Sequence, residues 1–204
     1  ASPRVALLNL ATVPCPPTMM LGVRANAGLA EALETPGRID DLFLERAKIE
    51  AAPRLDLLAS ELPQGRTPTV SDAAAEALLG RLQRSYHYVV LDVPRSLGNA
   101  ARTIAARAQT RILAAGGTLV SARDAALQMA GAPPAQRLLL VHNHAGRPGD
   151  LPDAELATAF GRAPDVTVPF LPRAFGTAQN LGTPAWREDA RAEAAVALLA
   201  REMS

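Results

Sequence analysis

Short apolar runs alternate along the chain with longer segments in which apolar positions recur every three or four residues. The runs are typical of buried strands, and the recurring spacing is typical of helices with one buried face. The runs predict strands at 5–10, 55–59, 88–92, 111–115, 138–143 and 166–170. The recurring spacing predicts helices at 26–33, 39–49, about 72–85, 99–108, 121–130 and about 185–202.

The order of these elements predicts the fold class. Strands that alternate with helices imply parallel β-α-β units, and right-handed crossovers place helices on both faces of the sheet. The Pro- and Gly-rich stretches at 131–136 and 146–152 are loops between elements rather than linkers between domains. We therefore expect one domain across residues 1–204, a three-layer α/β/α fold with a mostly parallel sheet.

Several helices carry signals at their ends or along one face. Ser71, followed by Asp72, predicts an N-cap, and Ser121 predicts another. One face of helix 39–49 carries Ile39, Leu42, Phe43 and Ala47. The C-terminal helix could form a narrow apolar stripe of Trp186, Ala190, Ala194, Leu198 and Met203. Because acids and bases alternate around this mostly alanine stripe, packing on the sheet is favoured over membrane binding.

Composition then narrows the class of protein. An apolar share of 49% and a charged share of 20% indicate a globular protein. The net charge of +1 gives no support for non-specific nucleic-acid binding. The single cysteine, Cys15, excludes an internal disulfide and fits a reducing compartment. No apolar run approaches the roughly 20 residues that span a bilayer, so we expect a cytoplasmic protein with peripheral membrane association at most.

The basic residues bear on phosphate chemistry. Of the 21 basic residues, Lys48 alone is a lysine, and it lies in a charged helical segment without neighbouring glycines. A phosphate-binding P-loop needs G-x-x-x-x-G-K-[ST], which places glycine amides and a lysine on the phosphates. No stretch of these 204 residues matches it.

The residues and loops that could bind a ligand follow the ends of predicted strands. The run at 88–91 finishes on Asp92, and loops rich in Gly, Pro and Asn follow strands 88–92, 138–143 and 166–170. In an open parallel sheet the carboxyl ends of strands form the ligand-binding edge. The Asp92 carboxylate could hold a metal ion or water against a phosphate, or it could cap the following loop.

Other polar residues have ordinary alternatives. Alternation places His142 and His144 on one strand face, but with His87 they lack the further ligands that zinc needs. We expect ordinary loop histidines. Three arginines on the loops could contact an anion or be solvated: Arg95, Arg147 and Arg173. Cys15 is expected to pack as a small hydrophobe.

Five stretches together resemble one family. They are GLAEALETPGRIDDLFLERA (28–47), RLDLLASELP (54–63), YHYVVLDVPRSLGNAART (86–103), LLLVHNHAGRPGDLP (138–152) and VPFLPRAFGTAQNLGTP (168–184). Their order and their residue patterns resemble those of the CpaE/TadZ branch of the MinD/ParA family, the deviant Walker ATPases of Flp (Tad) pilus assembly. The resemblance extends from residue 4 to about 185.

This resemblance implies a MinD/ParA-like P-loop NTPase fold, ATP and Mg²⁺ as cofactors, and a homodimer. It also implies Tad/Flp pilus secretion proteins as partners and a place at the cell pole or the inner face of the membrane. Asp92 falls on the Walker B aspartate, which acts on Mg²⁺ through water. Asn143 falls on the asparagine that reads adenine, although from the residues alone it could simply satisfy a strand-to-loop turn. Backbone groups around Pro169, Phe170, Pro172 and Phe175 flank the base.

The departures from the family are equally specific. Asn9 and Ala11 stand where the family has carboxylates, Gly116-Gly117 replaces Glu-Pro, and the family's P-loop would precede Ala1. Loss of one transition-state donor costs roughly 2.7–4 kcal/mol. We therefore expect a degenerate ATPase with weak or no hydrolysis that serves as an assembly platform. The alternatives are an active ATP-driven switch whose P-loop lies outside these residues and, less favoured by the near-neutral charge, a DNA-segregation protein.

Overall fold

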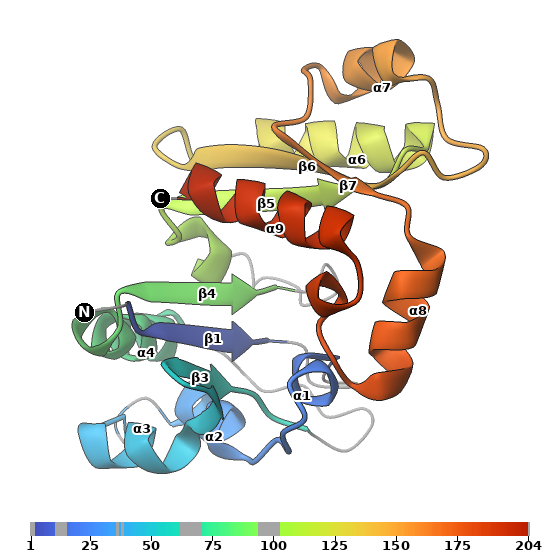
Figure 1. Ribbon diagram of the computed structural model, residues 1–204. Coiled ribbons are helices and arrows are strands. Elements are labelled where there is room, and N and C mark those ends of the chain that lie inside the picture. Colours follow the sequence, from blue (N-terminus) through green and yellow to red (C-terminus); the bar gives the residue numbers. More distant parts are fainter. Residues whose placement is uncertain are drawn as a thin grey trace. The chain divides into compact units, whose positions relative to one another are not determined.

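A computed structural model describes residues 3–10, 16–35, 37, 39–61, 71–93 and 103–203. The chain folds as two compact units, Ala1–Arg107 and Ala108–Ser204. Both units combine helices with mostly parallel strands, which confirms the predicted α/β class (Figure 1). The expectation of a single domain across 1–204 stays a prediction.

The first unit contains a four-stranded sheet in the order β2-β3-β1-β4. Its strands are β1 (Val5–Asn9), β2 (Ile49–Ala52), β3 (Leu55–Leu58) and β4 (Tyr88–Asp92). Strand β1 pairs in parallel with both β3 and β4, whereas β2 pairs antiparallel with β3. A tight turn with Arg54 at a φ of 70° joins β2 to β3. The helix predicted for 39–49 therefore ends earlier, and its last residues form β2.

Four helices of the first unit are α1 (Pro16–Met20), α2 (Gly28–Glu34), α3 (Asp41–Ala47) and α4 (Asp72–Ser85). Helix α4 begins at the predicted cap, because the Ser71 hydroxyl accepts a hydrogen bond from the amide of Ala74 at 3.1 Å. The predicted apolar face of α3 is partly wrong. Leu42 is exposed, while Leu44, which was not predicted, is buried in the core.

The core of the first unit lies between the sheet and helices α2, α3 and α4 (Figure 1). Strands β1 and β3 contribute Ala6, Leu8 and Leu58 to it, and α4 contributes Leu78, Leu79 and Leu82. Gly28 at the start of α2 contacts Ala47 so closely that a Cβ there would lie 2.5 Å from the Ala47 Cβ. Glycine at this position is what lets α2 approach the end of α3.

The second unit contains a three-stranded parallel sheet in the order β5-β6-β7. Its strands are β5 (Thr110–Ala115), β6 (Arg137–Ala145) and β7 (Val166–Pro169). Its helices are α6 (Leu119–Ala130), α7 (Asp153–Phe160), α8 (Pro172–Leu181) and α9 (Ala190–Met203), with a 3₁₀ turn at Ala185–Arg187. A core of Leu140, Leu156 and Phe160 joins β6 to α7.

Two features of the second unit differ from the sequence predictions. Helices α7 and α8 were not predicted, and 172–181 was read as loop. Pro172 stands in the first turn of α8, where its missing N–H is tolerated, and Gly182 ends the helix at a φ of 66°. Helix α6 is capped by Thr118 rather than Ser121, and the Ser121 hydroxyl instead accepts a hydrogen bond from the amide of Gly116.

Helix α9 packs against β7, as predicted for the C-terminal helix, but through a different face. Its buried residues are Ala192 and Ala195, three positions apart. The predicted stripe is wrong: Ala190, Ala194, Leu198 and Met203 are not among the buried residues. The short alanine side chains allow close packing, so the larger residues are not needed at the contact.

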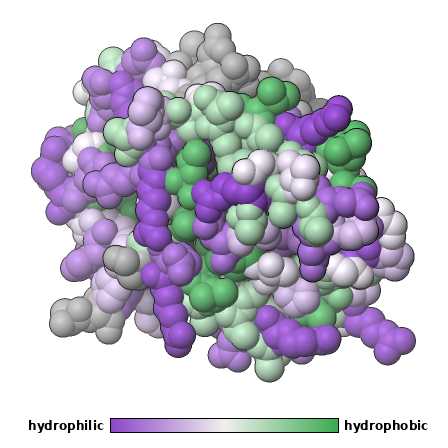
Figure 2. All heavy atoms as spheres, turned by 90° about the horizontal axis from the view of Figure 1, so that it is seen from above, coloured by the Kyte–Doolittle hydropathy of each residue, from purple (hydrophilic) through white to green (hydrophobic). Residues whose placement is uncertain are grey.

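The surface is mixed in character. Hydrophilic and hydrophobic residues are interspersed on the face that Figure 2 presents. Within the described ranges, no helix has the length and apolar character needed to cross a bilayer.

Candidate functional site

Asn9 and Asp92 lie side by side at the carboxyl ends of β1 and β4. The parallel register pairs the two residues directly. The Nδ2 atom of Asn9 donates a hydrogen bond to Oδ2 of Asp92 at 3.1 Å, and the Leu10 amide donates to the Asp92 carbonyl at 3.0 Å. The aspartate that the sequence marked is therefore held by the neutral side chain of Asn9.

The electrostatics of this pair differ from those of two carboxylates. Burial by the surrounding atoms raises the pKa of Asp92, although part of its side chain remains accessible. Asn9 is 1% exposed, and its Oδ1 atom is buried without a hydrogen-bond partner. The pair thus offers one negative charge and one neutral amide.

The single carboxylate of the pair is compatible with binding Mg²⁺ through water. Mg²⁺ keeps several waters and takes one or two carboxylates, so Asp92 alone could hold it through water. Among the described residues, no three His, Cys, Asp or Glu side chains gather as a metal site. The other interpretation of Asp92, a cap on the loop that follows, concerns residues outside the described ranges.

A second candidate site lies at the carboxyl end of β6. The pairing of β6 with β7 shifts register between Asn143 and Ala145, which makes His144 a bulged residue with a φ of 61°. Beyond the bulge, the Phe170 amide donates to the Ala145 carbonyl at 2.9 Å. Bulges re-aim side chains next to functional sites, and histidine is among the residues that tolerate this backbone region.

The bulge brings together three aromatic side chains, His144, Phe170 and Phe175. The His144 ring lies 5.9 Å from each phenylalanine ring, centroid to centroid, in edge-on geometry. Pro169 ends β7 and Pro172 starts α8, so the two prolines bracket Phe170. Aromatic faces suit a flat nucleobase. Two of these rings were predicted as adenine-side residues, whereas the part played by His144 was not.

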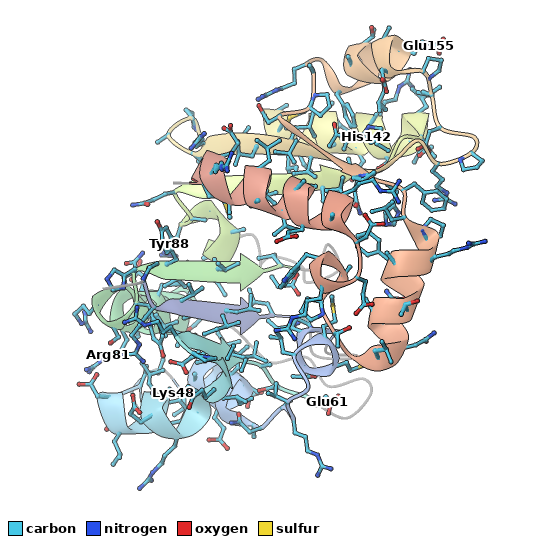
Figure 3. All side chains as sticks on the ribbon, in the orientation of Figure 1. Lys48, Glu61, Arg81, Tyr88, His142 and Glu155 are labelled. Atoms are coloured by element: carbon cyan, nitrogen blue, oxygen red, sulfur yellow. The ribbon has the colours of Figure 1, made fainter. Side chains whose placement is uncertain are left out.

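The remaining histidines have separate environments. His142 is buried on β6 against Phe160, with 6.5 Å between ring centroids (Figure 3). It therefore does not share its surroundings with His144, because the bulge breaks the alternation that the sequence predicted. His87 lies in the first unit, where its Nδ1 atom accepts a hydrogen bond from the Arg4 amide at 3.1 Å.

Other sequence candidates are exposed or lie outside the described residues. Arg147 and Arg173 are exposed on the segments that follow β6 and β7. Ala11, Cys15 and Arg95 lie outside the described ranges. At Gly117 a Cβ would collide with the Asp150 carboxyl group, whereas at Gly116 it would meet only the Ser121 hydroxyl at an ordinary distance. The Leu151 amide also donates to the Gly117 carbonyl at 2.8 Å.

A polar network that the sequence did not reveal lies at the amino end of the first sheet. The buried Asp56 carboxylate accepts hydrogen bonds from Arg4 at 3.1 Å and from the Tyr86 hydroxyl at 2.6 Å. The Arg4 guanidinium also lies over the Tyr86 ring at 4.9 Å. Burial, followed by the hydrogen bond to Asp56 and then its negative charge, raises the pKa of Tyr86. This end of the sheet is stabilised by the network and is separate from the Asn9–Asp92 end.

Comparisons with solved structures identify the fold. A ParA family ATPase from Chlorobium tepidum TLS is 16% identical and superimposes with a TM-score of 0.81, covering 95% of this chain and 83% of that chain. MinD from Pyrococcus horikoshii OT3, a septum site-determining protein solved with Mg-ADP, is 18% identical and has a TM-score of 0.81. The superposition covers 99% of this chain and 84% of that chain.

A complex of a substituted form of Cyanothece McdA with ATP is 14% identical with a TM-score of 0.61, covering 98% of this chain and 86% of that chain. No protein-family model matches the chain. No curated protein matches it by sequence either. At these identities the likeness establishes the fold, which is that of the MinD and ParA ATPases.

Proposed function

We propose that this chain is a positioning and assembly protein of the MinD/ParA type that hydrolyses ATP weakly or not at all. Its specific role, on this proposal, is the CpaE/TadZ-like one in Flp/Tad pilus biogenesis. The fold shared with MinD and ParA supports the broader part. The five family-like stretches, which include 138–152 and 168–184, support the pilus role.

The observation that carries the proposal of weak hydrolysis is the Asn9–Asp92 hydrogen bond. Phosphoryl transfer depends on a cation and on charge that positions it. A neutral amide in place of a carboxylate holds Asp92 but adds no charge for metal-bound water. Nucleotide affinity can survive such a change, because binding and hydrolysis use different groups.

ATP would be held at its base by the second candidate site. Asn143 would read the adenine edge, and the segment that contains Pro169, Phe170, Pro172 and Phe175 would flank the base. The neighbouring MinD and McdA structures are described with Mg-ADP and ATP, which supports these cofactors for the proposal. In the first unit, Asp92 would orient water on Mg²⁺ if the protein binds that ion.

The protein is proposed to act as a homodimer in the cytoplasm, at the cell pole or the inner face of the membrane. Its partners would be proteins of the Tad/Flp secretion machinery. A MinD neighbour solved in complex with MinC is an example of a partner-bound protein with this fold.

The decisive experiment is genetic. The gene is deleted from its host, and Flp pili are counted by electron microscopy before and after complementation with the natural chain. We expect loss of pili on deletion and recovery on complementation, together with a polar focus of a fluorescent fusion. Normal piliation in the deletion strain would overturn the pilus role, whatever the nucleotide results.

An active ATP-driven switch is the second candidate function. The observation that favours it is the aromatic cluster of His144, Phe170 and Phe175, since aromatic rings gathered at the end of β6 could flank a base. Titration of the full natural polypeptide with a fluorescent ATP analogue and a turnover assay separate the two candidates. Mg²⁺-dependent binding with steady phosphate release favours the switch, whereas binding without release favours the platform.

A further inference from the structure

Helix α6 turns its small apolar residues inwards and its large ones outwards. Its buried residues are Ala122 and Ala125. Val120 is 80% exposed and Leu127 is 73% exposed, which are the highest exposed fractions of any large apolar side chain in the described ranges. Surface helices normally carry charged or polar residues on the face opposite the core. The inverted pattern of α6 therefore marks a surface that suits a partner.

Val120 and Leu127 form one short stripe along α6. They are seven residues apart, which is close to two full turns, so both side chains leave the helix in nearly the same direction, about 10 Å apart along its axis. The helix lies against one face of the second sheet (Figure 1), where Ala122 and Ala125 share a core with Leu140 of β6. The stripe is on the side of α6 that faces away from this core.

Opposite charges border the stripe. Because successive residues of a helix are turned by about 100°, Arg123 and Asp124 lie on opposite sides of the line from Val120 to Leu127. Arg123 is exposed, and the half-buried Asp124 carboxylate accepts a hydrogen bond from Gln128 of the same helix at 2.8 Å. A helix that lies on a membrane carries basic residues on both sides of its apolar face. The mixed border of this stripe favours a protein partner instead.

We propose that α6 packs side by side and in parallel with α6 of a second copy of this chain, about a two-fold axis that runs along the helices. Each Val120 then meets its counterpart, and so does each Leu127. Arg123 of either copy faces Asp124 of the other, so the charges match on both borders of the contact. An antiparallel pair would place Arg123 opposite Arg123 and Asp124 opposite Asp124, which puts like charges together. The charge pattern therefore selects the parallel pair.

The size of the contact sets its strength. A helix of 12 residues is about 18 Å long, whereas a stable interface buries about 1,200–2,000 Å² in total. Pairing through α6 is therefore weak, and it operates where many copies of the chain are held close together. The contact rests on the homodimer of the proposed function but is measured without nucleotide or pili. A failure of the α6 contact is thus distinguishable from a failure of the pilus role.

Sedimentation velocity tests the apolar stripe. The natural chain is measured over roughly a hundredfold range of concentration, and we expect a monomer–dimer equilibrium at the upper end. Leu127→Glu should raise the dissociation constant by about tenfold or more, because each copy brings a carboxylate into the apolar contact. Leu181→Glu on α8, where the leucine is 64% exposed, is the control and should change nothing. A chain that stays monomeric throughout, or equal effects of the two variants, would overturn the proposal.

A charge exchange tests the borders of the contact. Arg123→Asp alone and Asp124→Arg alone each place like charges together twice in the dimer, so each should raise the dissociation constant by about threefold or more. The double variant restores opposite charges on both borders and should dimerise as the natural chain does. If the double variant were weakened by the product of the two single effects, Arg123 and Asp124 would not face each other, and the parallel arrangement would be wrong.

Disulfide trapping tests the direction of the two helices. Leu127→Cys is made together with Cys15→Ser, so that each chain carries a single thiol. A parallel pair brings the two new thiols together, and we expect a covalent dimer on mild oxidation. Leu181→Cys in the same background is the control and should remain monomeric. A covalent dimer that formed only between a Val120→Cys chain and a Leu127→Cys chain would show an antiparallel pair and overturn the proposal.

Discussion

The side-chain amide of Asn9 donates to the carboxylate of Asp92 across adjacent parallel strands, 3.1 Å from nitrogen to oxygen. An amide and a carboxylate form a stable pair without a cation, whereas two carboxylates at that distance repel each other. The first unit therefore has no electrostatic need for a metal at the carboxyl end of β1.

The variant Asn9→Asp should create that need. We expect it to destabilise the protein at neutral pH by at least about 1–3 kcal/mol, which is the cost of a buried polar group left without a partner, because a charged group costs more. Millimolar Mg²⁺ should restore part of the loss, as measured by urea unfolding. Asn9→Ala is the matched control, because it removes the amide without adding charge. If Mg²⁺ also restored the stability of Asn9→Ala, the effect of the ion would be unrelated to the introduced carboxylate.

The pH dependence of stability should carry a contribution from Asp92. Burial raises its native pKa, so the native state holds the proton more tightly than the unfolded chain. The protonated Asp92 therefore stabilises the native state fully at pH values below the pKa of the unfolded chain. This stabilisation is lost as the pH rises through the native pKa of Asp92. Asp92→Asn removes it, so the variant should gain stability over the natural protein as the pH increases from 4 to 7. If the unfolding free energies of the two proteins, measured with urea, changed equally between pH 4 and pH 7, this expectation would be wrong.

Tyr86→Phe probes the network around Asp56. Loss of the hydroxyl leaves the buried carboxylate with one donor fewer, and hydrogen bonds to charged groups contribute about 1.5–3 kcal/mol. We expect a loss of stability in that range at pH 7. Because the native pKa of Tyr86 is raised, the natural protein should also lose stability above about pH 10, and the variant should lack this alkaline component. Urea unfolding at pH 7 and pH 11 measures both effects.

Phe175→Ala should weaken nucleotide binding if the aromatic cluster holds a base. Stacking contributes about 1–3 kcal/mol per base, so we expect a loss of roughly tenfold or more in affinity for a fluorescent ATP analogue. Leu181→Ala, at the exposed end of α8, is the control and should bind normally. Unchanged affinity of Phe175→Ala, with its fold intact by circular dichroism, would place the base elsewhere.

Backbone strain at His144 is separable from its ring contacts. Glycine relieves a left-handed φ that alanine does not, and the difference is about 1–2 kcal/mol. His144→Gly should therefore be more stable than His144→Ala, as measured by thermal unfolding, although both lose the contacts to Phe170 and Phe175. Equal stability of the two variants would mean that the bulge relaxes once the ring is removed.

Features that depend on nearby residues could be predicted from the sequence. The apolar runs predicted the strands at 5–10, 55–59 and 88–92 to within a residue or two, and the Ser71 cap is a signal contained within one turn. Helix α8 could have been found from the same local evidence, since Pro172 and Gly182 mark its ends. There the glycines and prolines were taken as loop signals alone.

Features that depend on distant residues could not be predicted. The Asp56 network joins residues from the starts of β1, β3 and β4, and its pairing is set by strand order. The bulge at His144 depends on the register of β6 against β7, which hydrophobic alternation does not reveal. For the same reason the sequence marked Phe170 and Phe175 as site residues but did not mark the ring between them.

Strand β1 is bonded to a strand that is made much later in translation. The Arg4 amide and its acceptor His87 are separated by 83 residues. A ribosome must therefore complete the β2–β3 hairpin and all of α4 before β4 can close on its partner. In a nascent chain the edge of β1 that β4 later covers stays open through that interval, and during it this edge is accessible to non-native strand pairing.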